Sequence, residues 1–214
     1  MSVSQINLQN TFFCNKNGVV FANQLLGKEW VMRKVVELEE EKFGFETYSV
    51  SNIQLEISSK SKANAVILTG LKSGEGFKLV VICPDLDILQ VLNSNIQEPR
   101  YNFSVSSFEN KIVFIGGEKA SGPRNQLLSS CELLEFTFVP LTKQVEVIRH
   151  AFASLNEERN LHGSYITKEN GKSKFLYVLG GKIRKNEKFS TCLEWISLEH
   201  CDGDLLFNKV ELEH

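Results

Sequence analysis

Five cysteines are the first residues whose chemistry could define a site. No two of them have CxxC spacing, so the pattern does not predict a zinc site. Their odd number and wide separation also differ from the disulfide framework of a small secreted domain. We therefore expect buried free thiols in a reducing compartment, with neither a metal nor another cofactor bound. The cysteines are Cys14, Cys83, Cys131, Cys192 and Cys201.

Histidines and acidic residues offer weaker candidates. His162 stands at the start of an expected strand, but a general base or metal ligand needs a partner that the sequence does not identify. We expect His162 to have a structural, hydrogen-bonding role. His200 lies beside Cys201 and Asp202. A metal site would need further ligands from another part of the chain, and the sequence does not identify them. The run ELEEE at 37–41 is typical of a solvated face.

Two further stretches lack the spacing of a phosphate or calcium loop. GLKSGEG, from Gly70 to Gly76, precedes an expected strand rather than a helix and predicts a hairpin turn. PDLD, from Pro84 to Asp87, predicts a turn, because a calcium loop needs about five or more spaced oxygen ligands. The chain also has no GxSxG or HExxH motif. We therefore expect no catalytic residues and a protein that is not an enzyme.

Basic residues gather in two polar segments, each of which follows a Gly-Gly pair. Loops on a rigid scaffold are where binding residues collect. If both loops leave the same face, they form a positive patch that could bind an acidic peptide of another protein. The alternative is that these charges only keep the loops soluble. The basic residues are Lys119, Arg124, Lys182, Arg184, Lys185 and Lys188.

The elements that would position these loops form a repeat. Segments 110–136 and 173–198 each contain an apolar run, a Gly-Gly pair, a polar loop, Ser-Ser-Cys or Ser-Thr-Cys, and a second apolar run. The runs KIVFI, KFLYVL, CELLEFTF and CLEWISL are short and lack helical spacing, so they predict buried strands. A lone sheet leaves its apolar faces uncovered. The recurring pattern therefore predicts sheets that cover one another.

Glycine and arginine recur at matching positions of the two copies. Glycine pairs allow positive φ and close approach of the backbone to a neighbouring unit. The arginines are expected to be structural, either bridging neighbouring units or satisfying loop carbonyls. The recurring residues are Arg100, Gly116, Gly117, Arg159, Gly180 and Gly181. After the first arginine, the alternation of Tyr101, Phe103 and Val105 predicts one strand with a buried face.

This order of arginine, apolar strand, Gly-Gly, loop and tryptophan-bearing strand resembles the kelch repeat of β-propellers. The resemblance covers residues 100–198, with Phe136 where the second copy has Trp195 and with loops of different length. It implies an all-β, kelch-like β-propeller of about four blades, each of four antiparallel strands, at about 50 residues per blade. Propellers have about four to eight blades. The chain is thus either a compact four-bladed ring or part of a larger propeller, completed by further sequence or a second chain.

The two upstream blades are degenerate. IQLEI, AVILTG and KLVVICPDL predict strands, with Gly70 alone in the place of the glycine pair. GVVFA and EWVMRKVVEL predict strands of the first blade, although Trp30, Val31, Val35 and Leu38 also fit one face of a helix. The single propeller domain is expected to span 1–211, with 212–214 a tag remnant. Its expected blades are 1–48, 49–98, 99–152 and 153–211.

The net charge and the hydropathy of the chain limit the classes of partner and the cellular location that we expect. A net charge of -2 gives no reason to expect nucleic acid or an acidic membrane. No window approaches the roughly 18 apolar residues of a membrane span, and the polar N-terminus lacks a signal-peptide core. We therefore expect a cytoplasmic protein.

The kelch resemblance implies a non-catalytic protein-interaction module or scaffold that binds a partner through its loops. Open blade edges would also allow a homodimer. Two alternatives are a structural subunit of a cytoskeletal or other large assembly, and a propeller-fold enzyme.

Overall fold

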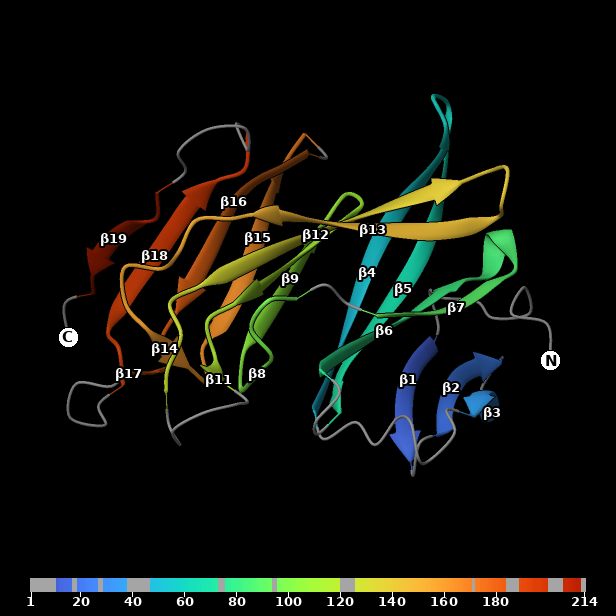
Figure 1. Cartoon of the computed structure of the whole chain (residues 1–214), viewed down its shortest axis with the longest axis horizontal. Helices are drawn as coiled ribbons and strands as arrows, with labels where there is room; N and C mark the ends of the chain where they lie inside the picture. Colours follow the sequence, from blue (N-terminus) through green and yellow to red (C-terminus); the bar gives the residue numbers. More distant parts are fainter. Residues whose placement is uncertain are drawn as a thin grey trace. The chain divides into compact units, whose positions relative to one another are not determined.

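The structure is a computed structural model of the chain, and its described part is built almost wholly of β-strands (Figure 1). Apart from one 3-10 turn at Pro84–Leu86, every regular element in that part is a strand. The prediction of an all-β fold with four-stranded antiparallel sheets is therefore confirmed. The structure describes residues 11–16, 19–26, 29–37, 47–72, 76–93, 96–119, 126–170, 172–183, 189–199 and 206–212.

The chain forms two compact units. The first contains Met1–Asn95 and Phe136–Val147, and the second contains Ile96–Glu135 and Ile148–His214. The chain passes between the units three times: between Asn95 and Ile96, within β12 (Cys131–Val139) and within β13 (Gln144–Ala151). All the expected partner-binding and signature residues belong to the second unit.

The first sheet is an antiparallel meander of β1 (Thr11–Lys16), β2 (Val19–Leu26) and β3 (Glu29–Glu37). β3 pairs with β2 along its whole length, so the helical alternative for Trp30, Val31 and Val35 is wrong. The available strand partner outweighs the helical spacing of the apolar residues, because pairing satisfies the backbone groups and a periodic pattern is only a weak prior. Leu38 lies outside the described residues.

The second sheet has the order β4-β5-β6-β7. Its strands are β4 (Thr47–Ser58), β5 (Ser61–Lys72), β6 (Gly76–Cys83) and β7 (Ile88–Asn93). β4 alternates buried and exposed residues from Ser51 to Glu56, as a strand with one solvated face does. β5 and β6 carry continuous buried runs, so both of their faces are covered.

Two predicted turns lie in this sheet. Lys72 pairs with Gly76, which places a hairpin connection within GLKSGEG. Pro84–Leu86 forms the 3-10 turn, and Asp87 follows it with φ 53°. Aspartate tolerates this left-handed conformation better than most residues, which suits PDLD to a turn.

The third and fourth sheets repeat one topology. The third has the order β13-β12-β10-β9 and the fourth, here called the C-terminal sheet, has the order β15-β16-β18-β19. The third sheet adds β9 (Ser104–Phe108) and β10 (Lys111–Ile115) to the β12–β13 hairpin. The C-terminal sheet consists of β15 (Gly163–Glu169), β16 (Lys172–Leu179), β18 (Cys192–Ser197) and β19 (Asn208–Glu211).

A two-stranded ribbon accompanies each of these sheets. β8 (Arg100–Tyr101) pairs with β11 (Glu118–Lys119), and β14 (Arg159–Asn160) pairs with β17 (Lys182–Ile183). The predicted continuous strand through Tyr101, Phe103 and Val105 is therefore wrong. Asn102 has φ 50°, a left-handed conformation that breaks strand geometry and separates β8 from β9.

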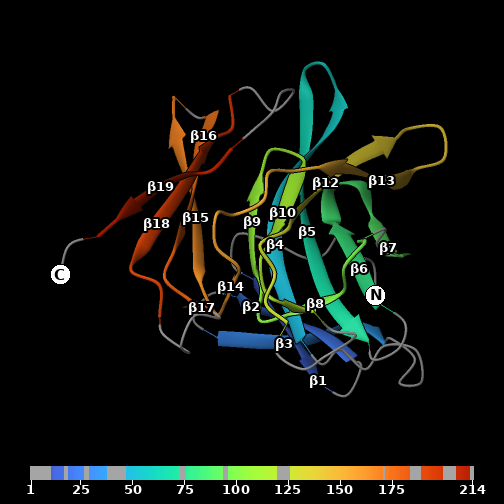
Figure 2. The same ribbon diagram turned by 60° about the vertical axis from the view of Figure 1, so that its left-hand side comes forward.

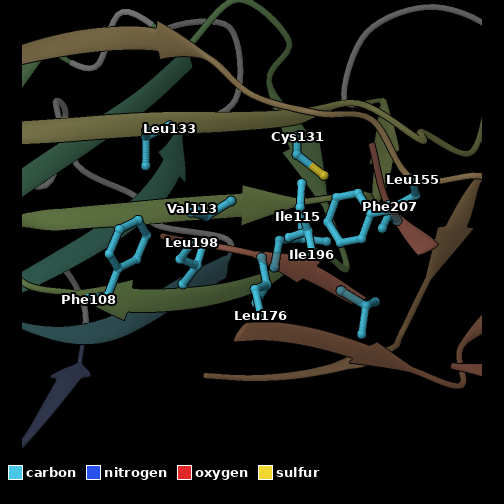
Figure 3. Packing of buried hydrophobic residues seen from close by; sticks show 11 residues of the cluster. Phe108, Val113, Ile115, Cys131, Leu133, Leu155, Leu176, Ile196, Leu198 and Phe207 are labelled. Atoms are coloured by element: carbon cyan, nitrogen blue, oxygen red, sulfur yellow. The ribbon is translucent and has the colours of Figure 1, made fainter. Parts of the chain in front are cut away.

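The core of the second unit lies between the third sheet and the C-terminal sheet. β9 and β15 lie side by side (Figure 2), and the hydroxyl oxygens of Ser106 and Ser164 are 2.8 Å apart across this contact. Aliphatic side chains from both sheets meet in one cluster with Phe108 and Phe207 (Figure 3). Cys131 lies in this cluster as a small apolar residue.

Candidate functional site

The base of the first basic loop is held by a buried arginine. Arg100, in β8, is fully buried. Its guanidinium donates to the carbonyl oxygens of Gly116 at 3.0 Å and Ser130 at 2.7 Å, one on each side of the loop. It also donates to the carboxylate of Glu132 at 2.6 Å. Because every bond is short and shielded from water, this group fixes both ends of the loop.

The carboxylate of Glu132 is satisfied by more than this ion pair. It accepts the backbone N–H of Gln97 at 2.8 Å and that of Glu98 at 3.2 Å. A buried carboxylate persists only when its charge is paired and its oxygens accept hydrogen bonds. Glu132 therefore ties the segment that precedes β8 to strand β12.

A second buried arginine repeats these contacts. The guanidinium of Arg159 donates to the carbonyl oxygens of Gly180 at 3.0 Å and Cys192 at 3.5 Å, and to the carboxylate of Glu194. Glu194 in turn accepts the backbone N–H groups of Asn156 at 2.6 Å and Glu157 at 3.3 Å. We call the two arrangements the Arg100–Glu132 clasp and the Arg159–Glu194 clasp.

Strand register establishes which residues of the two copies correspond. Ile115, just before Gly116, pairs with Cys131, whereas Leu179, just before Gly180, pairs with Leu193. Cys131 is therefore equivalent to Leu193, and Glu132 to Glu194.

The same register corrects one match made from the sequence. Trp195 pairs with Tyr177 and Leu133 pairs with Val113, so Trp195 corresponds to Leu133 and not to Phe136. The two Ser-x-Cys phrases are themselves offset by one residue in the folded sheets, since Cys131 is equivalent to Leu193 and not to Cys192. The loops before them differ in length, which concealed this offset.

Sequence reasoning missed the two glutamates. The available signal was an acidic residue inside an apolar strand at the same place in both copies, CELLEF and CLEWIS. A buried acidic residue inside a strand requires a cation nearby. The recurrent arginines were recognised as structural, and the structure shows them satisfying loop carbonyls, one of the two expected roles.

The carboxylate of Glu157 extends the later clasp, because it lies 3.3 Å from the guanidinium of Arg159. Partial burial raises the pKa of Glu157, but hydrogen bonds and charge from Lys209, with help from Ser190 and Arg159, outweigh this effect and leave the pKa below its usual value. The same contacts raise the pKa of Lys209. Both groups are therefore charged at neutral pH.

The stems of the two basic loops lie side by side. The side-chain amide of Asn160, in β14, donates to Glu118 of β11, and that of Asn102 donates to the same oxygen at 3.1 Å. Lys119 follows Glu118, and Lys182 pairs with Asn160 across the second ribbon. Both ribbons lie at one end of the second unit (Figure 1). The structure thus brings Lys119 and Lys182 to neighbouring stems.

Of the six basic residues, Lys119 and Lys182 are the two that lie among the described residues. Lys119 has a long ion pair with Glu98 at 3.8 Å, and both side chains are about one-third exposed. Such a pair is weak because water screens it. The other expected contact residues, Arg124, Arg184, Lys185 and Lys188, lie outside the described residues.

His162 is wedged between the two glycine pairs. A Cβ atom added to Gly116 would lie 2.9 Å from the ring carbon Cε1 of His162, and one added to Gly181 would lie 2.7 Å from its Cβ. Within the described part, neither ring nitrogen has a hydrogen-bond partner. The close glycine backbones thus enclose the ring by packing, and the hydrogen-bonding role stays a prediction.

The protonation of His162 follows from this position. Burial lowers its pKa to about 4, with a further contribution from the charge of Arg159 and a smaller opposing one from the backbone at Ile115. The imidazole is therefore neutral at physiological pH.

The thiols of this unit are also packed rather than activated. Burial raises the pKa of Cys131 to about 12 and also raises that of Cys192. Cys83, Cys131 and Cys192 are free and buried.

Within the described ranges, no group of three or more His, Cys, Asp or Glu side chains could hold a metal ion. In the same part of the chain, no helix is long and apolar enough to cross a membrane.

Comparison with known proteins gives little further information. No protein-family model matches the chain, and no curated protein matches it. Among solved structures, one described as "Structure of YjhT" is similar over 79% of this chain, with 11% sequence identity and a TM-score of 0.42. This chain spans about half, 53%, of the length of that one.

Proposed function

We propose that the chain is a kelch-like β-propeller, or part of one, that acts in the cytoplasm as a non-catalytic protein-interaction module. Its two loops after the glycine pairs bind an acidic segment of another protein. The two clasps support this proposal. The third sheet and the C-terminal sheet each have, at equivalent positions, an arginine before the sheet, a Gly-Gly pair and a buried glutamate. Buried free thiols are compatible with a reducing compartment.

The arrangement of the loop stems is the observation that carries the binding proposal. Each clasp ties both ends of its loop to a buried ion pair, and the Asn160–Glu118 contact holds the two stems together. A rigid base lowers the ordering cost that binding loops incur. Two adjacent basic loops on such a base can bind acidic side chains simultaneously.

The non-catalytic part of the proposal rests on the state of the buried reactive groups. The thiol of Cys131 stays protonated, and the imidazole of His162 is enclosed by backbone. The two buried glutamates are occupied by arginine and by backbone N–H groups. These groups stabilise the second unit. Cys131 and Glu132 also line a cavity of about 240 Å³, but the thiol is protonated and the carboxylate is engaged by Arg100 and by backbone N–H groups.

Fluorescence anisotropy with a labelled peptide of alternating Glu and Ser would test the binding. We expect the wild-type chain to bind it, and the triple variant Lys182→Glu, Arg184→Glu, Lys185→Glu to bind at least about tenfold more weakly. Added salt should weaken the wild-type binding, because exposed charges are screened.

A matched control uses Lys60→Glu and Lys168→Glu, two exposed lysines in strand hairpins away from these loops. This variant should bind as the wild type does. Absence of wild-type binding, or equal weakening by the control, would contradict the proposal.

A structural role in a larger assembly is the second candidate. It is favoured by exposed apolar side chains on the C-terminal sheet, including Tyr165, Leu179 and Val210. Contiguous apolar surface of this kind marks an interaction site.

A further inference from the structure

The two faces of the C-terminal sheet have different surroundings. Leu176, Val178 and Ile196 point to one face and lie in the core cluster against the third sheet. Residues that alternate with them point the other way, because successive side chains of a strand lie on opposite faces. We call this second face the outer face. It contains Tyr165, Phe175, Tyr177, Leu179, Leu193 and Trp195.

Aromatic and aliphatic side chains run across the outer face in register. Tyr165 pairs with Tyr177, which pairs with Trp195 on the next strand. The rings of Phe175 and Trp195 meet edge to face at 5.4 Å. Tyr165 is 68% exposed and Leu179 is 49% exposed. The sheet thus presents a continuous apolar surface that the described residues leave partly open.

The equivalent face of the third sheet is covered. By the register given above, Val113, Ile115 and Leu133 correspond to Tyr177, Leu179 and Trp195. These three residues of the third sheet are at most 4% exposed and lie in the core cluster. The C-terminal sheet covers them. The same face of the repeat is therefore buried by a neighbouring sheet in the first copy, whereas the described residues leave it partly open in the second copy.

The glycine pairs show the same difference. A Cβ added to Gly116 would lie 2.7 Å from the carbonyl oxygen of Arg159, which belongs to the next repeat. A Cβ added to the equivalent Gly180 would find no described atom within 4 Å. The backbone N–H of Leu212 does donate to Thr191 at 3.1 Å, which repeats the bond from Leu155 to Ser129. The first glycine of one pair is therefore packed against the next repeat, whereas the described residues leave space around the first glycine of the other pair.

We propose that the outer face of the C-terminal sheet binds a second copy of this chain, sheet against sheet, in a symmetric dimer. Within this molecule an equivalent face is covered by a sheet of the same repeat, through the face that contains Leu176 and Val178. A second copy also supplies a sheet of this repeat, which in the dimer would meet its partner through the outer face. Two antiparallel sheets pack face to face at about 10 Å with interdigitated side chains. In a twofold interface the same patch meets itself.

The charge of the outer face favours this occupant over others. Its three cross-strand rows contain no Asp, Glu, Lys or Arg among the described residues, and the nearest charge that contacts them is the ammonium of Lys174, 5.6 Å from the centre of the Phe175 ring at one edge. Two copies can therefore approach through the centre of the face with little like-charge repulsion. A charged partner would lose hydration on this face without gaining an ion pair. The rows are Gly163-Leu179-Leu193-Val210, Tyr165-Tyr177-Trp195-Asn208 and Thr167-Phe175-Ser197.

Sedimentation velocity of the full chain across a range of concentrations would test the dimer. We expect the wild type to sediment as a dimer, and Leu179→Glu and Tyr165→Glu each to raise the dimer Kd by at least about 100-fold. The effect is large because symmetry buries each introduced carboxylate twice. Both side chains are substantially exposed in the single chain, so the fold should persist, with an unchanged far-ultraviolet circular dichroism spectrum.

Leu141→Glu is the matched control, because Leu141 is 97% exposed and lies in the first unit. It should leave the dimer unchanged. A wild-type monomer at high concentration, or a dimer unaffected by both outer-face substitutions, would overturn the proposal. Neither result would bear on the basic loops, since peptide binding by them is measured separately and should survive in a monomeric outer-face variant.

Discussion

Arg100 and Glu132 meet at 2.6 Å in the interior of the second unit, and Arg159 and Glu194 occupy the equivalent positions of the next sheet. In each clasp the arginine binds the carbonyls at the two ends of a loop. The glutamate accepts hydrogen bonds from two backbone N–H groups in the segment that begins the same repeat. A single ion pair therefore joins the first segment, the glycine pair and the third strand of a repeat.

Loss of one partner from a clasp should be severely destabilising. Arg159→Leu leaves the carboxylate of Glu194 buried without its cation. We expect this to lower the free energy of unfolding by about 3–5 kcal/mol. The double variant Arg159→Leu, Glu194→Leu removes both charges and should recover part of that loss. Urea denaturation followed by circular dichroism measures both effects.

An exposed ion pair provides the control for the clasp. Lys62 and Glu56 are 3.3 Å apart, with both side chains at least half exposed. Lys62→Leu should change the free energy of unfolding by less than about 1 kcal/mol. If Arg159→Leu were no more destabilising than Lys62→Leu, the clasp would not have the structural importance assigned to it.

Gly117 and Gly180 should differ in their tolerance of alanine, because Gly180 is the one glycine of the two pairs at which an added Cβ would meet no described atom. Gly117 has φ 102°, and an added Cβ would lie 2.6 Å from the carbonyl oxygen of Tyr101. Gly180 has φ 68° with open space around the added atom. Gly180→Ala should therefore cost about 1–2 kcal/mol from backbone conformation alone. Gly117→Ala should cost clearly more, because the clash adds to that strain.

Gly163→Ala calibrates this comparison. Gly163 has neither a positive φ nor any atom within 4 Å of an added Cβ. Its substitution should leave the urea midpoint nearly unchanged. Equal losses for Gly117→Ala and Gly180→Ala would mean that close packing contributes nothing beyond the backbone strain.

Short-range patterns account for what could be predicted from the sequence. Apolar runs bounded by turn residues located most strands, including KIVFI, which coincides with β10. The same residues could not decide between helix and strand at Trp30, because that choice depends on pairing with β2. The break at Asn102 was also missed, since the alternation of its neighbours continues through it.

The candidate site was harder to predict because it depends on register. Arg100 and Glu132 are far apart in the sequence, and only the pairing of β10 with β12 shows that Glu132 and Glu194 are equivalent. The enclosure of His162 likewise requires the positions of two glycine backbones from different sheets. Motif spacing gave the glycines and arginines, while tertiary packing determines which groups they meet.

The neutral state of His162 makes stability depend on pH. Its pKa is about 4 in the folded chain and about 6.5 when unfolded. Between these values the unfolded chain binds the extra proton, so the free energy of unfolding falls as the pH drops from about 6.5 towards 4. The full effect is about 3 kcal/mol. Urea denaturation across this range measures it.

His162→Gln should flatten the pH dependence between about 6.5 and 4. The carboxyl groups of Glu135 and Glu157 have lowered pKa values, so their contributions are lost only below the usual range of a carboxyl group, as the pH falls further. The two windows are therefore separable. An unchanged slope in His162→Gln would show that another group causes the dependence.

The buried thiols should resist alkylation while the chain is folded. The reactive species is the thiolate, and with a pKa of about 12 Cys131 has almost none at pH 8. Cys83 and Cys192 are also buried with raised pKa values. Brief treatment with iodoacetamide followed by peptide mass spectrometry should find these three cysteines unmodified, whereas the same treatment in urea should modify all three. Rapid modification of Cys131 in the folded chain would mean that the interface between the third and C-terminal sheets opens readily.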